Sequence, residues 1–157
     1  MKRLSWDDYF LKMALLTAER STCRRHHIGA VIVRDKRVLT TGYNGAAKGA
    51  TDCLELGCLR DELDIPSGTR HEICRAIHAE QNAIIQAGLY GVSIVDSTMY
   101  CTHSPCFICA KMIVNAGIKR VCTYGNYSDD QYIDLFKEAG IEFQILAKPG
   151  TNITLKE

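Results

Sequence analysis

The sequence lacks the features that mark several protein classes. It has only three prolines and one tryptophan among 157 residues, and its 46% apolar and 24% charged residues are ordinary proportions, which excludes wholesale disorder, collagen and coiled coil. It contains no internal repeat. No apolar run approaches the roughly 18 residues that a membrane span needs. Asp7 and Asp8 stand where a secretory signal peptide requires apolar residues, so we expect a cytoplasmic protein with no membrane partner.

A charge excess of one sign is also missing. The 19 basic residues nearly balance the 18 acidic ones, for a formal charge of +1. Proteins that bind nucleic acid usually carry a basic excess or stripe. The longest basic cluster here is Arg24-Arg25, followed by two histidines. Nucleic acid is therefore an unlikely partner on composition alone.

The hydrophobic pattern predicts an α/β protein. The predicted helices cover residues 6–20, 78–87, 106–116 and 129–139, and the predicted strands cover 28–33, 37–41, 98–102, 120–124 and 141–145. The first two strands form an antiparallel hairpin, whereas the last three alternate with helices and should run parallel. We therefore predict a three-layer α/β/α fold with a five-stranded mixed sheet, in one domain covering residues 1–157.

Two other segments differ in pattern. Residues 45–75 form a long insertion with only a short helical pattern at 54–63, and residues 148–157 read as a tail. Poorly patterned segments as long as 45–75 are usually functional in a compact domain.

Two short motifs carry the chemistry. His78-Ala-Glu80 and Pro105-Cys106-Phe-Ile-Cys109 both fall at predicted helix starts. The positive end of a helix dipole favours thiolate, the form of cysteine that binds zinc. Cys106 and Cys109 are three residues apart and share one helical face. With His78 they make three ligands, which leaves the fourth position of a catalytic zinc site for water.

Glu80 is predicted to act on that water. It follows His78 by two residues, a spacing that does not place both side chains on one helical face. At a helix end it can reach past the metal and exchange protons. The alternatives are a redox pair or a structural zinc at Cys106 and Cys109, and a plain helix N-terminal carboxylate at Glu80.

The combination His-x-Glu with Pro-Cys-x-x-Cys is the signature of zinc deaminases. Over about residues 4–147 the chain resembles the zinc-dependent cytidine/deoxycytidylate deaminase superfamily, and within it the deoxycytidylate (dCMP) deaminases more closely. The closer likeness rests on Cys23, Gly29-Ala-Val-Ile-Val33, Gly42-Tyr43-Asn44-Gly45, Cys53, residues 78–83 and residues 116–119.

The resemblance implies a cytidine-deaminase-like fold and a hydrolase that converts dCMP and water to dUMP and ammonia, feeding dTMP synthesis. It assigns His78, Cys106 and Cys109 to the catalytic zinc and Glu80 to proton transfer. It further implies a homo-oligomer, usually a hexamer, activated by dCTP and inhibited by dTTP with Mg²⁺.

Nucleotide-binding residues are less sharply indicated. The family uses the segment around Asn44 near bound nucleotide, so Tyr43, Asn44 and Gly45 are candidates, with a plain Asn-Gly turn as the alternative. A 5′-phosphate needs a cation or convergent N–H donors. The further candidates for contacts with nucleotide are Arg24, Arg25, Arg75, Tyr124 and Tyr127. Solvated charges and ordinary packing are the alternatives for them.

A second, structural zinc is predicted from the remaining cysteines. Cys23 and Cys53 match positions that some members of the family use for an additional zinc. His71 and Cys74 are three apart, a spacing suited to joint chelation. The predicted site is Cys23, Cys53, His71 and Cys74, and Cys58 could replace any of these. The alternative is a set of unconnected thiols and a surface histidine.

Two rival functions stay open at this stage. One is another zinc deaminase, acting on cytidine or on an adenosine in tRNA. The lack of a basic excess and the Gly-Tyr-Asn-Gly segment count against it. The other is a non-catalytic zinc-binding regulator or DNA-uptake factor, which nothing supports because Glu80 and all three ligands are present.

Overall fold

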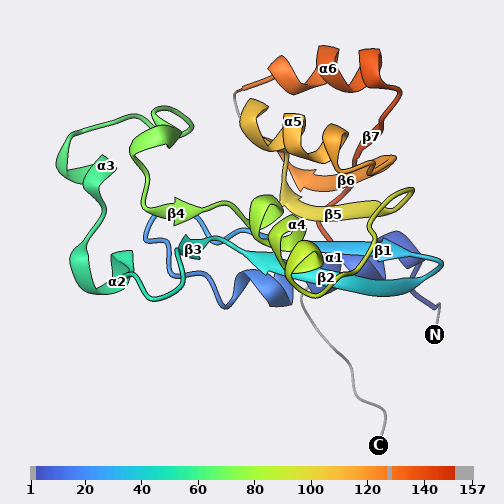
Figure 1. Cartoon of the computed structure of the whole chain (residues 1–157), viewed down its shortest axis with the longest axis horizontal. Coiled ribbons are helices and arrows are strands. Elements are labelled where there is room, and N and C mark those ends of the chain that lie inside the picture. Colours follow the sequence, from blue (N-terminus) through green and yellow to red (C-terminus); the bar gives the residue numbers. More distant parts are fainter. Residues whose placement is uncertain (1–2, 127–128, 151–157) are drawn as a thin grey trace, which may run out of the picture.

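The computed structural model describes residues 3–126 and 129–150, and a five-stranded sheet lies at its centre (Figure 1). The helices are α1 (Trp6–Ala18), α2 (Cys53–Leu56), α3 (Leu59–Glu62), α4 (Ala79–Leu89), α5 (Phe107–Asn115) and α6 (Gln131–Ala139), with a 3₁₀ turn at His71–Ile73. The strands are β1 (Gly29–Arg34), β2 (Arg37–Tyr43), β3 (Gly45–Ala46), β4 (Ala76–Ile77), β5 (Thr98–His103), β6 (Arg120–Gly125) and β7 (Glu142–Ile145). None of the helices in these residues has both the length and the apolarity of a membrane span.

The sheet is mixed, as the sequence predicts. Its strand order is β2-β1-β5-β6-β7. β1 runs antiparallel to both β2 and β5, whereas β5, β6 and β7 are parallel to one another. Parallel neighbours need a crossover, which α5 and α6 provide. β5 is therefore the central strand of the sheet, and α5 is the next element after its carboxyl end.

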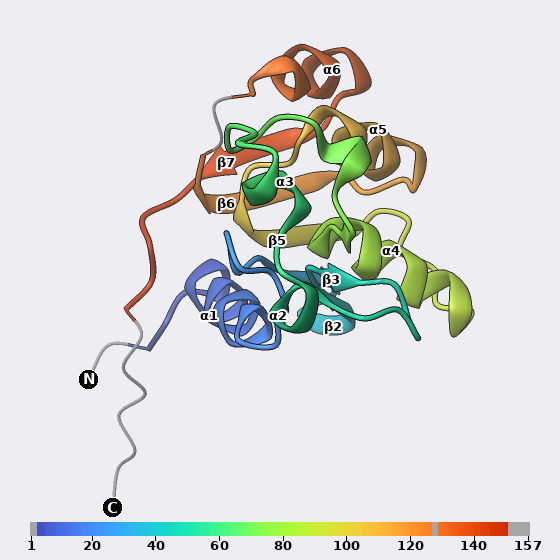
Figure 2. The ribbon, with the colours of Figure 1, turned by 90° about the vertical axis from the view of Figure 1, so that its left-hand side faces the viewer.

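Helices cover both faces of the sheet, which makes three layers (Figure 2). Alternate residues of β1 face opposite ways, so Val31 and Val33 pack with α1, whereas Ala30 and Ile32 pack with α4. α5 and α6 pack on the same face of the sheet as α4, where Ile113 and other apolar side chains extend the core. Burial on both faces explains why β1 is a continuous apolar run and not an alternating one.

Two glycines allow helices to lie directly on the hairpin. A Cβ atom on Gly29 would stand 2.1 Å from the carbonyl oxygen of Ala14 in α1, and one on Gly42 would stand 2.3 Å from that of Ala79 in α4. Both approaches involve backbone atoms, which cannot rotate away. The contact at Gly42 sets the position of the first turn of α4, the turn that carries Glu80.

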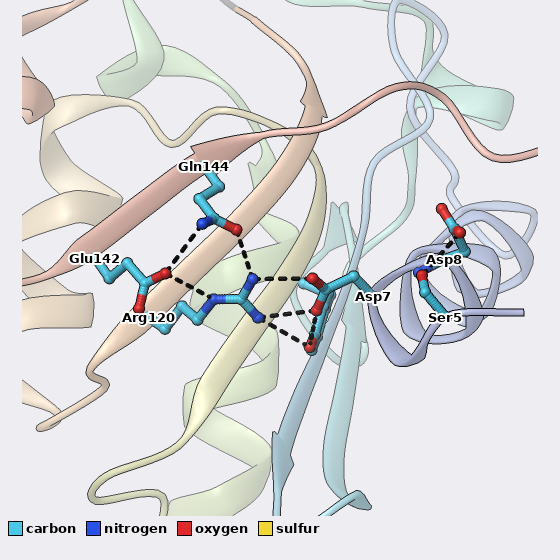
Figure 3. Close-up of polar contacts among 7 residues, drawn as sticks. Ser5, Asp7, Asp8, Arg120, Glu142 and Gln144 are labelled. Carbon is cyan, nitrogen blue, oxygen red and sulfur yellow. Dashed lines mark hydrogen bonds and ion pairs between the residues drawn. The ribbon is translucent and has the colours of Figure 1, made fainter.

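A polar network connects the start of α1 to strands β5, β6 and β7 (Figure 3). Arg120 on β6 donates to both carboxylate oxygens of Asp7, at 2.8 Å and 2.9 Å. The Tyr100 hydroxyl donates to Asp7 at 2.7 Å. On its other side Arg120 contacts Glu142 and Gln144 on β7. The network therefore links α1, β5, β6 and β7.

The long segment between β2 and α4 differs most from the prediction. The helical pattern at 54–63 forms two short helices, α2 and α3, because Gly57 between them has φ of 87° and interrupts the first. β3 and β4 pair antiparallel through Gly45–Ile77 and Ala46–Ala76, a pairing that the sequence analysis did not predict. The pairing holds the two ends of the segment together, beside the start of α4.

Candidate metal centre

Two helix N-termini meet at the end of β5 and bring three metal-binding side chains together. His78 is the N-cap of α4 and Cys106 is the N-cap of α5. The Nδ1 atom of His78 lies 3.5 Å from the Cys106 sulfur and 3.3 Å from the Cys109 sulfur. Within residues 3–126 and 129–150, this is the only group of three or more His, Cys, Asp or Glu side chains whose ligand atoms all lie within 4.8 Å of one another.

The electrostatics of the centre suit a cation. Cys106 is 6% exposed and Cys109 is fully buried. Hydrogen bonds from the Cys109 thiol and from His78 lower the pKa of Cys106 to about 4 against the opposing effect of burial. A thiolate held at neutral pH beside a second sulfur and an imidazole nitrogen is a donor set typical of zinc. The residues therefore fit the metal that the sequence predicts.

Glu80 lies in the same pocket as His78 and Cys106 but outside the group of ligand atoms. It is the second residue of α4 and only 4% exposed. Burial raises the pKa of Glu80, and the nearby His78 partly opposes the rise. A carboxyl group placed beside a metal centre can both take and return a proton, and a raised pKa favours the return.

Residues from distant parts of the sequence line the pocket next to the metal centre. Besides Glu80 and His78 it is lined by Arg25 and Asn44 from around the first hairpin, and by Arg60 and His71 from the long segment. The long segment thus closes one side of the pocket, in keeping with the expectation that it is functional.

Asn44 holds the pocket wall in place. Its Oδ1 accepts hydrogen bonds from the Ser21 hydroxyl at 2.6 Å and from the Ile28 amide at 2.9 Å, and its Nδ2 donates to the His26 carbonyl at 2.8 Å. From its place between β2 and β3, Asn44 therefore anchors the loop that joins α1 to β1, and it is also a candidate for nucleotide contact.

The other nucleotide candidates are spread out. Arg24 is exposed and does not line the pocket, whereas Arg25 does, with an ion pair to Asp61 at 2.5 Å. Arg75 donates to the Thr51 carbonyl. The remaining predicted positions are Tyr43, 37% exposed at the end of β2; Gly45, buried in β3; Tyr124, beside His103 and Lys148; and Tyr127, outside the described residues.

Three residues of the predicted second zinc site, Cys23, His71 and Cys74, line the pocket beside the metal centre. Burial raises the pKa of Cys53, and the nearby thiols of Cys58, Cys23 and Cys74 raise it further, so the four thiols are neighbours. All four are free thiols. His71 instead lies against His78, with ring centroids 4.9 Å apart. Within the described residues, no second set of three or more His, Cys, Asp or Glu side chains has all its ligand atoms within 4.8 Å of one another.

Sequence reasoning missed Arg60. It is 6% exposed and lies in the pocket wall. The helical pattern at 54–63 contains it, but nothing in the pattern distinguishes a buried arginine from an exposed one. Its burial depends on how the whole long segment folds back onto the metal centre.

Comparison with known proteins gives consistent results. The model of the cytidine and deoxycytidylate deaminase zinc-binding region matches residues 4–125. The deoxycytidylate deaminase of Schizosaccharomyces pombe is 39% identical over 96% of this chain and 47% of its own length. ComE operon protein 2 of Bacillus subtilis is 42% identical over 90% of this chain and 71% of its own. The chain thus spans about half the length of the S. pombe enzyme.

Solved structures agree with these sequences. The dCMP deaminase of cyanophage S-TIM5, solved in complex with dCMP and dUMP, superposes with a TM-score of 0.75 at 32% identity, over 93% of this chain and all of that one. The five-stranded sheet and its helices are therefore shared with a protein that binds these two nucleotides.

Proposed function

The chain belongs to the cytidine and deoxycytidylate deaminase family, and on this premise we propose that it converts dCMP and water to dUMP and ammonia. The observation that carries the proposal is the buried Glu80 in one pocket with a His78, Cys106 and Cys109 centre. This pairing of a three-ligand zinc site with a separate carboxyl group is the arrangement of the zinc deaminases.

The centre binds zinc, and we assign His78, Cys106 and Cys109 as its ligands. Zinc held by three protein ligands lowers the pKa of a water in its fourth position to about 7. The protein's own part is to keep the two sulfurs and the imidazole in place. α4 and α5 achieve this because each begins at a ligand.

Glu80 moves the protons. Hydrolysis adds the oxygen of water to the ring carbon that carries the amino group and a proton to the adjacent ring nitrogen, and the bond from that carbon to the amino group then breaks. The Glu80 carboxylate can take one proton from the water and give it to the ring nitrogen. It can then take the second proton from the new hydroxyl and give it to the departing amine, which leaves as ammonia while the ring gains a carbonyl. Burial raises the pKa of Glu80, which makes its carboxylate a better proton acceptor in this role.

The competing deaminase functions differ in substrate alone. Cytidine lacks a phosphate and carries a 2′-hydroxyl, and a tRNA adenosine requires a surface for a polyanion. Ammonia release from dCMP, deoxycytidine, cytidine and tRNA, measured side by side, tests the proposal. We expect dCMP to be the best substrate by at least tenfold in kcat/KM. A higher value for any of the others would reassign the substrate.

We also propose a structural zinc at Cys23, Cys53, Cys58 and Cys74. The support is the proximity of the four thiols, which raises the pKa of Cys53 beyond the effect of burial. Cys58 takes the place of His71 in the set predicted from the sequence, because His71 lies beside His78. Four thiolates form a closed site with no open position, as structural zinc sites do.

Regulation and assembly rest on the resemblance alone. A hexamer, activation by dCTP, and inhibition by dTTP with Mg²⁺ stay predictions for this chain. Initial rates against dCMP concentration test them. We expect a sigmoidal curve that dCTP shifts to lower concentration, and a hyperbolic curve unaffected by either nucleotide would contradict the regulatory prediction.

A further inference from the structure

Arg60 is a buried cation with no anionic partner in the described part of the chain. Its side chain lies on α3, and the residue is 6% exposed. Its Nη2 donates to the Pro66 carbonyl at 3.4 Å, and its Nε has no hydrogen-bond partner. None of the ion pairs formed within residues 3–126 and 129–150 includes Arg60.

Arg25 is the second arginine of the same pocket, and it differs in its partners. Its Nε donates to Asp61 at 2.5 Å, and its Nη2 donates to the Ile65 carbonyl at 2.7 Å. Asp61 therefore balances the charge of Arg25. Its Nη1 is nevertheless buried and without a partner. The pocket wall thus holds one uncompensated guanidinium and one spare donor from another.

Both guanidinium groups lie close to the metal centre. The pocket that they line also contains His26, His78 and Glu80. Burial lowers the pKa of His26, and the charges of Arg25 and Arg60 lower it further. His26 therefore lies within the field of both guanidinium groups.

A buried guanidinium without an anion is costly, because the charge has left water and gained no opposite charge in return. An anion that binds in the pocket removes this cost. The planar fork of arginine matches the oxygens of a phosphate in geometry and charge. The proposed substrate supplies a dianionic phosphate on its 5′ carbon, whereas the corresponding nucleoside supplies none.

We propose that Arg60, assisted by the unpartnered Nη1 of Arg25, binds the 5′-phosphate of the nucleotide and so makes the enzyme select nucleotides over nucleosides. This assignment rests on the proposed function and names a specificity-determining residue for it. It also explains why the long segment lies against the metal centre, since that segment delivers Arg60 on α3.

The test compares dCMP with deoxycytidine, which lacks only the phosphate, in the zinc-loaded wild type and in Arg60→Gln and Arg60→Lys. We expect Arg60→Gln to lower kcat/KM for dCMP by roughly 10- to 100-fold, the effect of losing a charge-assisted hydrogen bond. The value for deoxycytidine should stay within about twofold. Arg60→Lys should recover part of the loss, since it keeps the charge. Arg20→Gln, at an exposed arginine after α1, is the matched control and should leave both values unchanged.

The outcomes separate this inference from the proposed function. A wild type that prefers dCMP, with the same preference in Arg60→Gln, would overturn the inference alone. An equal loss on both substrates in a variant that melts like the wild type would do the same, because it would indicate a structural role. A wild type that releases ammonia from neither substrate would overturn the proposed function as well. If Arg60→Gln fails to fold, calorimetric binding of dUMP and deoxyuridine to Arg60→Lys decides, with an unchanged dUMP preference counting against the inference.

Discussion

The ring of His71 packs edge-on against the ring of His78, with centroids 4.9 Å apart and planes at 79°. The Nε2 atom of His71 lies 3.1 Å from the Gly68 carbonyl oxygen, which can only accept, so this nitrogen carries the proton. His71 is thereby fixed as a wall of the catalytic pocket. His71 and Cys74, three residues apart, line the same pocket, and the Cys74 amide donates to the His71 carbonyl at 3.1 Å.

Zinc content distinguishes the two ligand sets for the structural zinc, one containing Cys58 and the other His71. Wild-type protein should contain two zinc ions per chain, measured by elemental analysis after dialysis against zinc-free buffer. Cys58→Ser should contain one, since a closed site cannot hold its metal well with three thiolates. His71→Ala should keep two. Cys106→Ser should lose the catalytic zinc and nearly all activity.

The opposite pattern would restore the ligand set predicted from the sequence. One zinc in His71→Ala and two in Cys58→Ser would place His71 in the structural site. A single zinc in zinc-replete wild type would remove the second site altogether. Cys122→Ser, at a buried thiol on β6 with no role in either site, controls for the general effect of losing a cysteine.

The Asp7–Arg120 pair should make stability depend on pH. Hydrogen bonding from Arg120 lowers the pKa of Asp7 in the folded protein, although burial opposes the shift. A carboxyl group in unfolded chains has a pKa of about 3.9. The stabilisation is therefore fully present above about pH 4 and is lost as the pH falls through the lowered folded value.

Asp7→Asn tests this dependence. The variant should have a free energy of unfolding about 1–3 kcal/mol below that of the wild type at pH 7. The gap should shrink as the pH drops below about 4, when Asp7 becomes neutral in the wild type too. Urea denaturation of both proteins at pH 7 and at a pH below about 4 measures this difference in the free energy of unfolding. Loss of zinc in acid affects both proteins alike, so a gap of constant size would contradict the account.

The contact of Gly42 with α4 predicts an overpacking defect. Gly42→Ala forces a methyl group against the Ala79 carbonyl and should destabilise the protein by about 1–3 kcal/mol or more. Because this contact sets the first turn of α4, activity should fall as well. Thermal melting and initial rates measure the two effects.

Gly88 on the same helix is the matched control. A Cβ atom there meets no atom within 4 Å, so Gly88→Ala should stabilise the helix by about 0.5–1 kcal/mol and leave activity unchanged. Equal melting temperatures for the two variants would show that the close approach at Gly42 does not constrain the helix.

Much of the fold follows from local signals in the sequence. The hydrophobic pattern located α4, α5 and α6 within a few residues, and the alternation of strands and helices predicted the parallel half of the sheet. The centre at His78, Cys106 and Cys109 was predictable because His78 and Cys106 each start a helix and Cys109 follows Cys106 by three residues. The structure brings these three side chains together as that pattern predicts.

The long segment was not predictable in the same way. Its structure depends on contacts between distant residues, such as the β3–β4 pairing and the ion pair of Arg25 with Asp61. Neither has a periodic signal. The burial of Arg60 and the position of His71 follow from these contacts, so the sequence indicated that the segment was functional without locating its functional side chains.

Conversion of dCMP to dUMP by zinc-loaded wild type and by the Glu80→Gln variant tests the central claim most directly. Gln keeps the shape of the side chain but cannot exchange a proton, and Glu80 lies outside the group of zinc ligands. We predict rapid turnover in the wild type, and in the variant a loss of at least roughly 10²- to 10⁴-fold in kcat with unchanged zinc content. Near-normal turnover in Glu80→Gln, or no deamination of dCMP by the wild type, would contradict the account.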